Sequence, residues 1–320
     1  MINLKGVQAM DNPESYVVTG AFGYTGKYIT KRLLARGIRV KTLTGHPDPH
    51  SSFAGRISVA PYRFDNPGDL VKSLQGTTVL INTYWIRFPY GSVTYDMAVA
   101  NTKILIRAAE EAGIRRIVHV SISNPSESSS LPYFKGKGQL EKVIINSKLS
   151  YAIIRPTVIF GKEDILINNI AWLLRRFPVF AIPGTGDYKL QPVFVEDMAD
   201  LVVGAAGKDE DFIVDAVGPE TYTFNDLVRL IRARIGSKSR IVHLRPGLAL
   251  FLSGLIGRIV NDVVLTRDEV AGLMADLLIS KNSPVGKTRL SEWLTQNATA
   301  VGISYASELN RHYRDVSDVK

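Results

Sequence analysis

The fold of this chain is decided by the stretch Val17-Val18-Thr19-Gly20-Ala21-Phe22-Gly23-Tyr24-Thr25-Gly26, which an apolar-periodic helical run follows. An apolar strand that breaks into three glycines spaced three apart, and then restarts as a helix, can carry a dinucleotide pyrophosphate over the helix N-terminus. Gly20 permits the tight turn, Gly23 leaves room for the phosphates, and Gly26 lets the helix pack closely on the strand. The turn therefore predicts a nucleotide cofactor, contacted also by Phe22, Tyr24 and Thr25, against the alternative of a purely structural turn.

Short apolar strands alternate with helices after this turn. Strands are predicted at residues 16–19, 38–44, 57–64, 79–82, 117–121, 151–155 and 212–217, and helices at 26–36, 69–74, 93–112, 133–147 and 196–206. Such alternation is typical of a parallel sheet covered on both faces, with ligands at the C-terminal ends of the strands. The sequence thus predicts an α/β fold with a doubly wound Rossmann sheet.

Two regions are expected. The Rossmann domain takes residues 1–162 and about 190–218, and a smaller, mostly helical substrate or partner region takes about 163–189 and 219–320. In the smaller region, residues 178–187 form a Pro- and Gly-rich connection, and helices are predicted at 164–177, 224–235, 246–260, 266–279, 291–298 and 304–314. Thr266 and Glu269 have the spacing of a capping box.

The segment 246–257 is strongly apolar but shorter than the roughly 20 residues that span a bilayer. We expect it to be buried in a core, in a dimer interface or shallowly in a membrane surface. No spanning segment is predicted.

Composition excludes several kinds of chemistry. The chain has 320 residues with 45% hydrophobic and 22% charged content and no cysteine, so disulfides, thiolate catalysis and cysteine-ligated metals are excluded. No grouping of His, Asp and Glu has metal-ligand spacing, and we expect no metal. Residues 1–15 lack a continuous apolar segment and do not form a secretory signal. A cytoplasmic protein is expected, with peripheral contact to a membrane as an open option.

The net charge of +9 invites a nucleic-acid interpretation. The Lys and Arg residues are scattered, however, and the densest pairs have no interleaved aromatics of the kind that stack on bases. A basic surface suits a phosphorylated cofactor equally well. We therefore expect a small-molecule substrate and no nucleic-acid partner.

Candidate catalytic groups follow the fifth predicted strand. Tyr133 and Lys137 are four residues apart on one helical face, so the ammonium could lower the pKa of the phenol. The phenol would then exchange a proton with a carbonyl or alcohol while a serine hydroxyl holds the substrate oxygen. A pair on a solvated helix face is the alternative.

The end of the second strand informs the choice of cofactor. An NAD site commonly places a carboxylate there for the ribose 2′-hydroxyl, but this chain has Leu43-Thr44-Gly45-His46. Thr44 and His46 can donate to a 2′-phosphate, which favours NADP(H) over NAD(H). The alternative for His46 is a loop histidine in water.

The fourth strand is expected to lead into a substrate pocket. It ends at Asn82 and Thr83, beside the cofactor ribose, and Tyr84, Trp85 and Arg87 then form an aromatic and cationic loop. Loop aromatics that pack only on their neighbours are the alternative. Asn168 and Asn169 are also placed in the pocket, as is Arg155, for which a buried structural role is equally open.

Together these motifs resemble the short-chain dehydrogenase/reductase superfamily, in its extended and atypical branches, over about residues 15–235. The resemblance rests on Thr19-Gly20-x-x-Gly23-x-x-Gly26, Asp65, Ser121 and Ser123, Tyr133-x-x-x-Lys137, Arg155-Pro156 with Gly161, and Val195-x-Asp197-Met198-Ala199. Residues 265–270 and 218–220 are most similar to the branch with the nucleotide-binding accessory subunit of respiratory complex I. NmrA-like and NAD(P)-dependent epimerase/dehydratase-like proteins belong to the same superfamily.

The resemblance implies a role for each matching residue. The three glycines would contact the pyrophosphate, Asp65 the adenine, and Lys137 the nicotinamide ribose, with Pro156 also at the cofactor. Ser123 rather than Ser121 matches the family's catalytic serine, and Tyr133 matches its proton donor. Relatives often pair through the helices that begin near residues 93 and 133, which implies a homodimer.

Two hypotheses on function follow. The first is an NAD(P)-dependent oxidoreductase or epimerase-type enzyme that acts on a small carbonyl or alcohol. The second is a non-catalytic NADP(H)-binding assembly or sensing protein that docks on a partner or a membrane surface. It is supported by the apolar segment 246–257 and by the gap of ten positions between Ser123 and Tyr133, which is shorter than the family norm.

Overall fold

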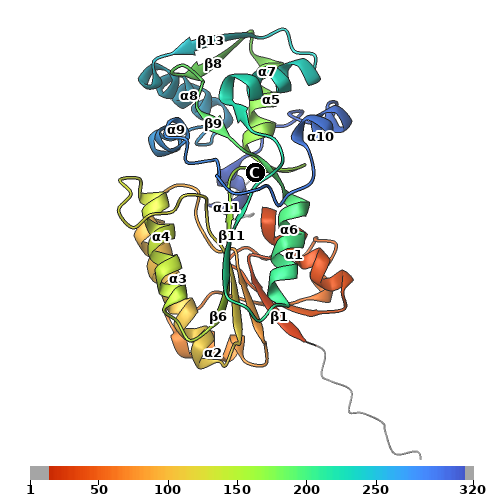
Figure 1. Cartoon of the computed structure of the whole chain (residues 1–320), viewed down its shortest axis with the longest axis vertical. Helices are drawn as coiled ribbons and strands as arrows, with labels where there is room; N and C mark the ends of the chain where they lie inside the picture. Colours follow the sequence, from red (N-terminus) through yellow and green to blue (C-terminus); the bar gives the residue numbers. More distant parts are fainter. Residues whose placement is uncertain (1–13, 314–320) are drawn as a thin grey trace, which may run out of the picture.

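A seven-stranded sheet forms the centre of the larger of two lobes in the computed structural model, which describes residues 14–313 (Figure 1). The strand order is β11-β6-β5-β4-β1-β2-β3, and every neighbouring pair is parallel. The strands are β1 Ser15–Thr19, β2 Arg39–Leu43, β3 Ser58–Ala60, β4 Val79–Asn82, β5 Arg116–Val120, β6 Ser150–Pro156 and β11 Phe212–Ala216. The predicted doubly wound Rossmann sheet is confirmed.

Helices cover both faces of this sheet. On one face lie α1 (Tyr24–Ala35) and α6 (Val195–Ala206), and on the other lie α2 (Pro67–Leu74), α3 (Tyr95–Glu111) and α4 (Pro132–Ile145). Successive strand residues point to opposite faces, so Val18 packs with the first pair of helices and Val17 with the other three. We call the sheet with these five helices the Rossmann lobe.

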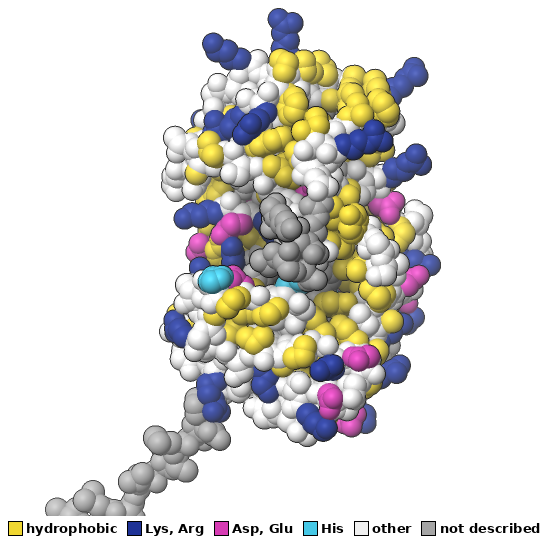
Figure 2. All heavy atoms as spheres, turned by 180° about the vertical axis from the view of Figure 1, so that it is seen from behind, with side chains coloured by type: hydrophobic (Ala, Val, Ile, Leu, Met, Phe, Trp, Pro, Cys, Tyr) yellow, Lys and Arg dark blue, Asp and Glu magenta, His cyan; other side chains and the backbone are white. Residues whose placement is uncertain are grey.

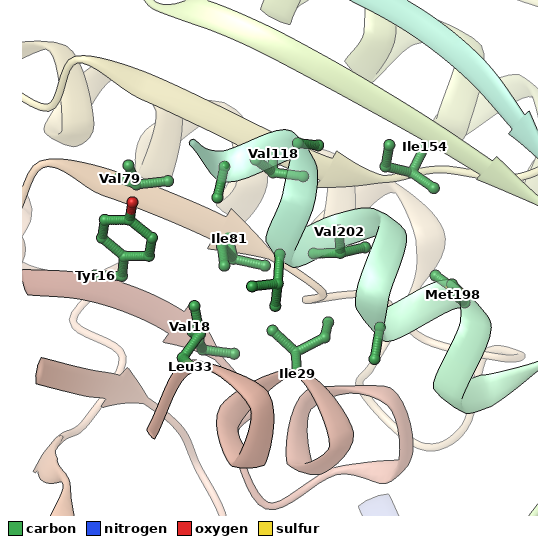
Figure 3. Packing of buried hydrophobic residues seen from close by; sticks show 14 of the residues in the cluster. Tyr16, Val18, Ile29, Leu33, Val79, Ile81, Val118, Ile154, Met198 and Val202 are labelled. Atoms are coloured by element: carbon green, nitrogen blue, oxygen red, sulfur yellow. The ribbon is translucent and has the colours of Figure 1, made fainter. Parts of the chain in front are cut away.

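The core under α1 and α6 holds these helices to the sheet (Figure 3). Val18, Ile81 and Val118 belong to the central strands, and side chains of both helices pack over them. Ile29 of α1 and Val202 of α6 have no exposed surface. Burial of each such side chain contributes about 1.5–3 kcal/mol, and it fixes the start of α1 over the end of β1.

The other lobe is mostly helical. The small lobe comprises residues 164–190 and 219–313 and contains α5 (Leu166–Arg176), α7 (Phe224–Arg234), α8 (Pro246–Val260), α9 (Arg267–Met274), α10 (Leu290–Asn297) and α11 (Glu308–His312). Its strands are β8 (Val179–Pro183), parallel to β13 (Arg240–Leu244), and β9 (Lys189–Leu190), antiparallel to β12 (Tyr222–Thr223). Between the lobes, β7 (Ile159–Phe160) pairs with β10 (Val193–Phe194). In the Rossmann lobe, a 3-10 turn covers Ala54–Arg56 between β2 and β3.

Several predicted bounds are corrected. Residues 178–187 are not only a connection, because they contain β8. The helix expected at 266–279 ends at Met274, and Asp276 then adopts a left-handed backbone with φ of 54°. The capping box at its start is confirmed, since the Glu269 amide donates to Thr266 Oγ1 at 3.2 Å. Most of the segment 1–15 and the end of the helix predicted at 304–314 lie outside the described residues.

No helix within residues 14–313 is long and apolar enough to cross a membrane.

Candidate functional site

The glycine turn is shaped to hold a phosphate group. Gly20 has a φ of +65°, and the Gly23 amide donates to the Gly20 carbonyl oxygen at 2.9 Å. A Cβ added to Gly26 would lie 2.1 Å from that oxygen, so α1 can approach β1 this closely only with glycine there. No side chain of the described residues caps α1, and its first amides are free to bind an anion. The turn therefore fits a dinucleotide pyrophosphate.

A hydrogen-bonded network fixes the strand ends beside this turn. Thr19 Oγ1 accepts from the amides of Thr83 (2.7 Å) and Tyr84 (3.0 Å) and donates to Asn82 Oδ1 (3.1 Å). Asn82 also contacts His119 Nδ1 at 3.0 Å, and burial holds the pKa of His119 well below its usual value, so the imidazole is neutral. Asn82 is fully buried, and in the structure it orders β1, β4 and β5.

A cavity of about 830 Å³ lies between the lobes at these strand ends. Besides Asn169 of α5, the structure brings eight predicted site residues to its wall: Tyr24, Thr25, Thr83, Trp85, Arg87, Tyr133, Lys137 and Pro156. They come from the start of α1, the loop after β4, helix α4 and the end of β6. These residues from several strand ends thus lie around one cavity, and their roles toward a cofactor or a substrate stay predictions.

The catalytic assignment of Ser123 is corrected. Ser123 is fully buried outside the cavity wall, and its Oγ donates to the Leu277 carbonyl oxygen at 2.6 Å. Ser121 lines the cavity instead. Two residues of extended chain advance about 6.8 Å, which carries Ser123 past the cavity and under the small lobe.

Two predicted pocket residues also lie elsewhere. Tyr84 packs against Tyr62 and Phe64, with ring centroids 5.1 and 5.3 Å away, so it is a loop aromatic held by its neighbours. Asn168 donates to Asp164 Oδ2 at 3.1 Å and accepts from the Gly302 amide at 3.2 Å, and it does not reach the cavity.

Asn169 does line the cavity. Arg155 has the structural role of the alternative hypothesis, although it is half-buried rather than buried: its Nε donates to Glu141 Oε1 at 3.0 Å. The Ser121 hydroxyl donates to the same carboxylate.

Trp85 determines how Tyr133 and Lys137 are arranged. The Lys137 ammonium lies 4.5 Å from the centre of the Trp85 ring, and Tyr133 meets the same indole edge to face at 5.7 Å. Gly136 makes this packing possible, since an added Cβ would lie 2.8 Å from the indole. Lys137 also donates to the Val120 carbonyl oxygen at 2.8 Å.

The expected lowering of the phenol pKa by Lys137 is therefore wrong for this structure. Burial raises the pKa of Tyr133 above its usual value near 10, and the carboxylates of Glu269 and Glu308 add to the rise. Burial lowers the pKa of Lys137 to about 7, partly opposed by Glu141. Helical spacing puts both residues on one face, but the indole occupies the space beside the ammonium.

The adenosine end of the predicted site lies outside the cavity. Thr44 follows β2 and its Oγ1 accepts from the exposed His46 amide at 3.1 Å, while Asp65 is exposed in the turn after β3. Phe22 stacks on Phe53 with ring centroids 5.7 Å apart. The roles of these four predicted residues toward a cofactor remain predictions.

Sequence reasoning missed the contribution of α11. The Arg311 guanidinium lies 5.8 Å from the centre of the Tyr24 ring and donates to the Glu163 carbonyl oxygen at 2.7 Å. His312 Cε1 would be 3.7 Å from a Cβ on Gly23. Both side chains line the cavity beside the glycine turn. Only the basic and aromatic run Arg311-His312-Tyr313 hints at this in the sequence.

Among residues 14–313, no group of His, Asp and Glu could hold a metal ion.

Known proteins are similar to this chain in sequence and in fold. Residues 20–167 match the NAD(P)H-binding family model. The mitochondrial NADH dehydrogenase [ubiquinone] 1 alpha subcomplex subunit 9 of Arabidopsis thaliana is 26% identical over 87% of this chain and 75% of its own length. The same subunit of Mus musculus is 28% identical, over 76% of this chain and 66% of its own length. A photosystem II assembly factor of Cyanidium caldarium is 23% identical, over 76% of this chain and 78% of its own length.

Solved structures with the same fold include enzymes. A nucleoside-diphosphate-sugar epimerase from Staphylococcus aureus superposes with a TM-score of 0.71 at 16% identity, over 88% of this chain and 99% of its own. The NADPH-dependent quinone oxidoreductase from Escherichia coli, complexed with NADPH, superposes with a TM-score of 0.69 at 19% identity, over 88% of this chain and 99% of its own. Together with the parallel sheet and the glycine turn, the family match gives the chain an NAD(P)H-binding domain over residues 20–167, and the epimerase and the quinone oxidoreductase share its fold.

Proposed function

We propose that the protein is an NADP(H)-dependent oxidoreductase that reduces a carbonyl group to an alcohol. One observation carries this proposal: a single cavity extends from the start of α1, past Tyr133 and Lys137, into the small lobe. A cofactor on the glycine turn and a substrate in the small lobe would therefore meet beside the phenol. The absence of a carboxylate at residues 43–46 supports NADP(H) over NAD(H).

The protonation of Tyr133 favours the direction of reduction. The bound nicotinamide would supply the hydride to the carbonyl carbon, and the carbonyl oxygen must gain a proton. A phenol with an ordinary pKa near 10 is already protonated at neutral pH, and burial raises the pKa of Tyr133 further, so Tyr133 holds the proton that the carbonyl oxygen must gain. Lys137 is placed to bind the nicotinamide ribose, and Ser121, rather than Ser123, lies at the cavity wall, where its hydroxyl donates to Glu141.

The walls of the cavity favour an oxidoreductase over a sugar-nucleotide epimerase. Recognition of a sugar nucleotide needs several charged or hydrogen-bonding side chains around the sugar. The charged and ionisable small-lobe residues of the wall come from α9 and α11 (Asp268, Glu269, Glu308, Arg311 and His312), and from residue 165 to residue 265 the wall has only Asn169 and Ser253 as polar members.

Changing Tyr133 to Phe tests this proposal. We expect the oxidation of NADPH by aldehyde or quinone substrates to fall about 100-fold or more, with the dissociation constant for NADPH nearly unchanged. Tyr84→Phe is the matched control, because Tyr84 lies outside the cavity. Full turnover in the Tyr133→Phe protein would overturn the mechanism.

A second candidate is a non-catalytic NADP(H)-binding protein that acts in assembly or sensing. It is favoured by the packing of Ser123 on Leu277 and by the indole over Lys137, which leave the expected catalytic set incomplete. Relatives named as a complex I subunit and an assembly factor support it further. Titration with all four nicotinamide forms, beside a screen of carbonyl substrates, separates the two: tight binding without turnover favours this candidate.

The homodimer expected from the resemblance remains part of the proposal. It would form through α3 and α4, and sedimentation equilibrium would test it.

A further inference from the structure

The cavity continues well beyond the place where a nicotinamide would lie. Its small-lobe part follows α5 from Ile165 to Phe177, a length of about 18 Å at the rise of an α-helix. The opposite walls are β8, β13 and α8, which contribute Phe180, Val242 and Ile256. This elongated part, which we call the apolar channel, has no charged wall residue between residues 165 and 265.

Helix α8 covers the apolar channel and is apolar on its outer side too. Between residues 246 and 260 the only charged side chain is Arg258. Leu248 and Phe251 are 48% and 63% exposed and do not line the channel. An apolar patch facing water is unfavourable, and in folded proteins such patches commonly mark a binding surface.

The rim of the channel is apolar as well. Val179, Leu255 and Ile259 line the cavity and are also exposed, Ile259 to 75%. A ligand that entered from water would have to pass these side chains without gaining a polar contact. A ligand that entered from a hydrocarbon phase would stay in apolar surroundings throughout.

The charge around α8 points to an anionic surface. Residues 230–261 contain six Lys and Arg and no Asp or Glu, and residues 165–186 add two Arg and again no acid. Figure 2 shows Lys and Arg side chains projecting around the hydrophobic patches at this end of the small lobe. Exposed apolar side chains among cations are the combination that binds anionic bilayers.

We propose that the apolar channel binds the hydrocarbon chain of a lipid-like carbonyl compound, which enters from an anionic bilayer on which α8 rests. The carbonyl end would reach Tyr133 while the chain lies along α5. The identity of the reacting end rests on the proposed oxidoreductase function. The binding of the chain does not.

Binding of the chain can be measured without any turnover. The probe is cis-parinaric acid, a fluorescent fatty acid, titrated into the full-length protein. We expect saturable binding to one site and a loss of affinity of at least about tenfold in Ala181→Trp, whose indole would fill the channel. Ala233→Trp on the exposed surface of α7 is the matched control. Unchanged binding in Ala181→Trp, at wild-type NADPH affinity and circular dichroism, would overturn the channel site.

Leu252→Trp is a second filling variant, used if Ala181→Trp fails to fold. Its binding of parinaric acid is expected to fall in the same way, and unchanged binding in a folded Leu252→Trp protein would equally overturn the site.

Membrane docking is tested by co-sedimentation with vesicles of equimolar phosphatidylglycerol and phosphatidylcholine. The double variant Leu248→Ser with Phe251→Ser should lose vesicle binding and keep parinaric acid binding, because neither residue lines the channel. The double variant Val59→Ser with Ile213→Ser, two exposed apolar residues of the Rossmann lobe, is the control. Equal sedimentation of both double variants, or binding of nucleic acid in preference to vesicles, would overturn the docking surface.

A series of straight-chain aldehydes links the channel to turnover. We expect kcat/KM for NADPH oxidation to rise about fourfold per added methylene until the channel is filled, and to stop rising in Ala181→Trp. Activity that does not depend on chain length would overturn the lipid-like substrate. Parinaric acid binding without any turnover would leave the channel site and refute only the oxidoreductase.

Discussion

Gly26 leaves no space for even a methyl group, because an added Cβ would lie 2.1 Å from the Gly20 carbonyl oxygen. In Gly26→Ala we expect α1 to shift from β1, with a loss of about 2 kcal/mol in the free energy of unfolding and much weaker binding of NADPH. Gly204→Ala is the control, since its added Cβ meets nothing within 4 Å and alanine favours the interior of α6. Thermal unfolding and NADPH titration of both variants check the prediction. Equal behaviour of the two would contradict it.

Lys137 makes the stability depend on pH in a defined direction. Its pKa is about 7 in the folded protein and near 10.5 in the unfolded chain, so between these values only the unfolded chain binds the proton. The free energy of unfolding should therefore rise with pH from about 7 upward, and this rise should be missing in Lys137→Met. Urea unfolding between pH 7 and pH 9 measures the slope, with Lys135→Met on the exposed side of α4 as control. A slope retained in Lys137→Met would show that another group causes it.

At the scale of residues, the sequence predicted which side chains gather at the strand ends better than how they act. Spacing along one element placed Tyr133 and Lys137 on a common face of α4. It carried no information on Trp85, which comes from the loop after β4 and takes the space over the ammonium. Ser121 and Ser123 are two residues apart, so in an extended chain their side chains point to the same side. Only the small lobe, which packs Ser123 against Leu277, separates their positions relative to the cavity.

At the scale of elements, Glu269 connects α9 to the Rossmann lobe. It completes the capping box with Thr266 and also accepts from Arg87 Nε at 2.6 Å, which ties the loop after β4 to the small lobe. We expect Glu269→Ala to lower the free energy of unfolding by about 2 kcal/mol, since both the cap and the ion pair are lost. Glu269→Gln should cost about half as much, because glutamine can still complete a capping box. Chemical denaturation measures both, and equal losses would mean that the cap has no share.

The elements that the sequence predicted most accurately are those with a local pattern. Helix α8 has the predicted bounds, 246–260, because proline begins it and a mostly apolar run follows, interrupted only by Ser253 and Arg258. Strand β8 was missed because its partner β13 lies about sixty residues further along, with Val179 opposite Arg240. A five-residue strand between prolines and glycines has no periodicity to distinguish it from a connection.

At the scale of the molecule, α11 joins the two lobes. Asp262, after α8, accepts from the Glu308 amide at 2.8 Å, and Tyr313 donates to the Phe88 carbonyl oxygen at 2.5 Å. Arg311 also donates to the carbonyl oxygen of Glu163, in the segment between β7 and α5. Helix α11 thus lies beside the start of α1 (Figure 1), a contact between segments almost 290 residues apart that no local pattern could predict.

This contact gives Arg311 an expected role in cofactor binding. Its guanidinium lies beside Tyr24 at the start of α1, where the amides of the glycine turn would bind the pyrophosphate. A cation at this place would strengthen the binding of that anion. We expect Arg311→Ala to raise the dissociation constant for NADPH about tenfold. Calorimetric titration measures this, with Arg229→Ala, which removes an exposed pair on α7, as control. Because a pyrophosphate contact is ionic, the difference between wild type and Arg311→Ala should shrink as salt is added. An unchanged dissociation constant would mean that α11 only joins the lobes.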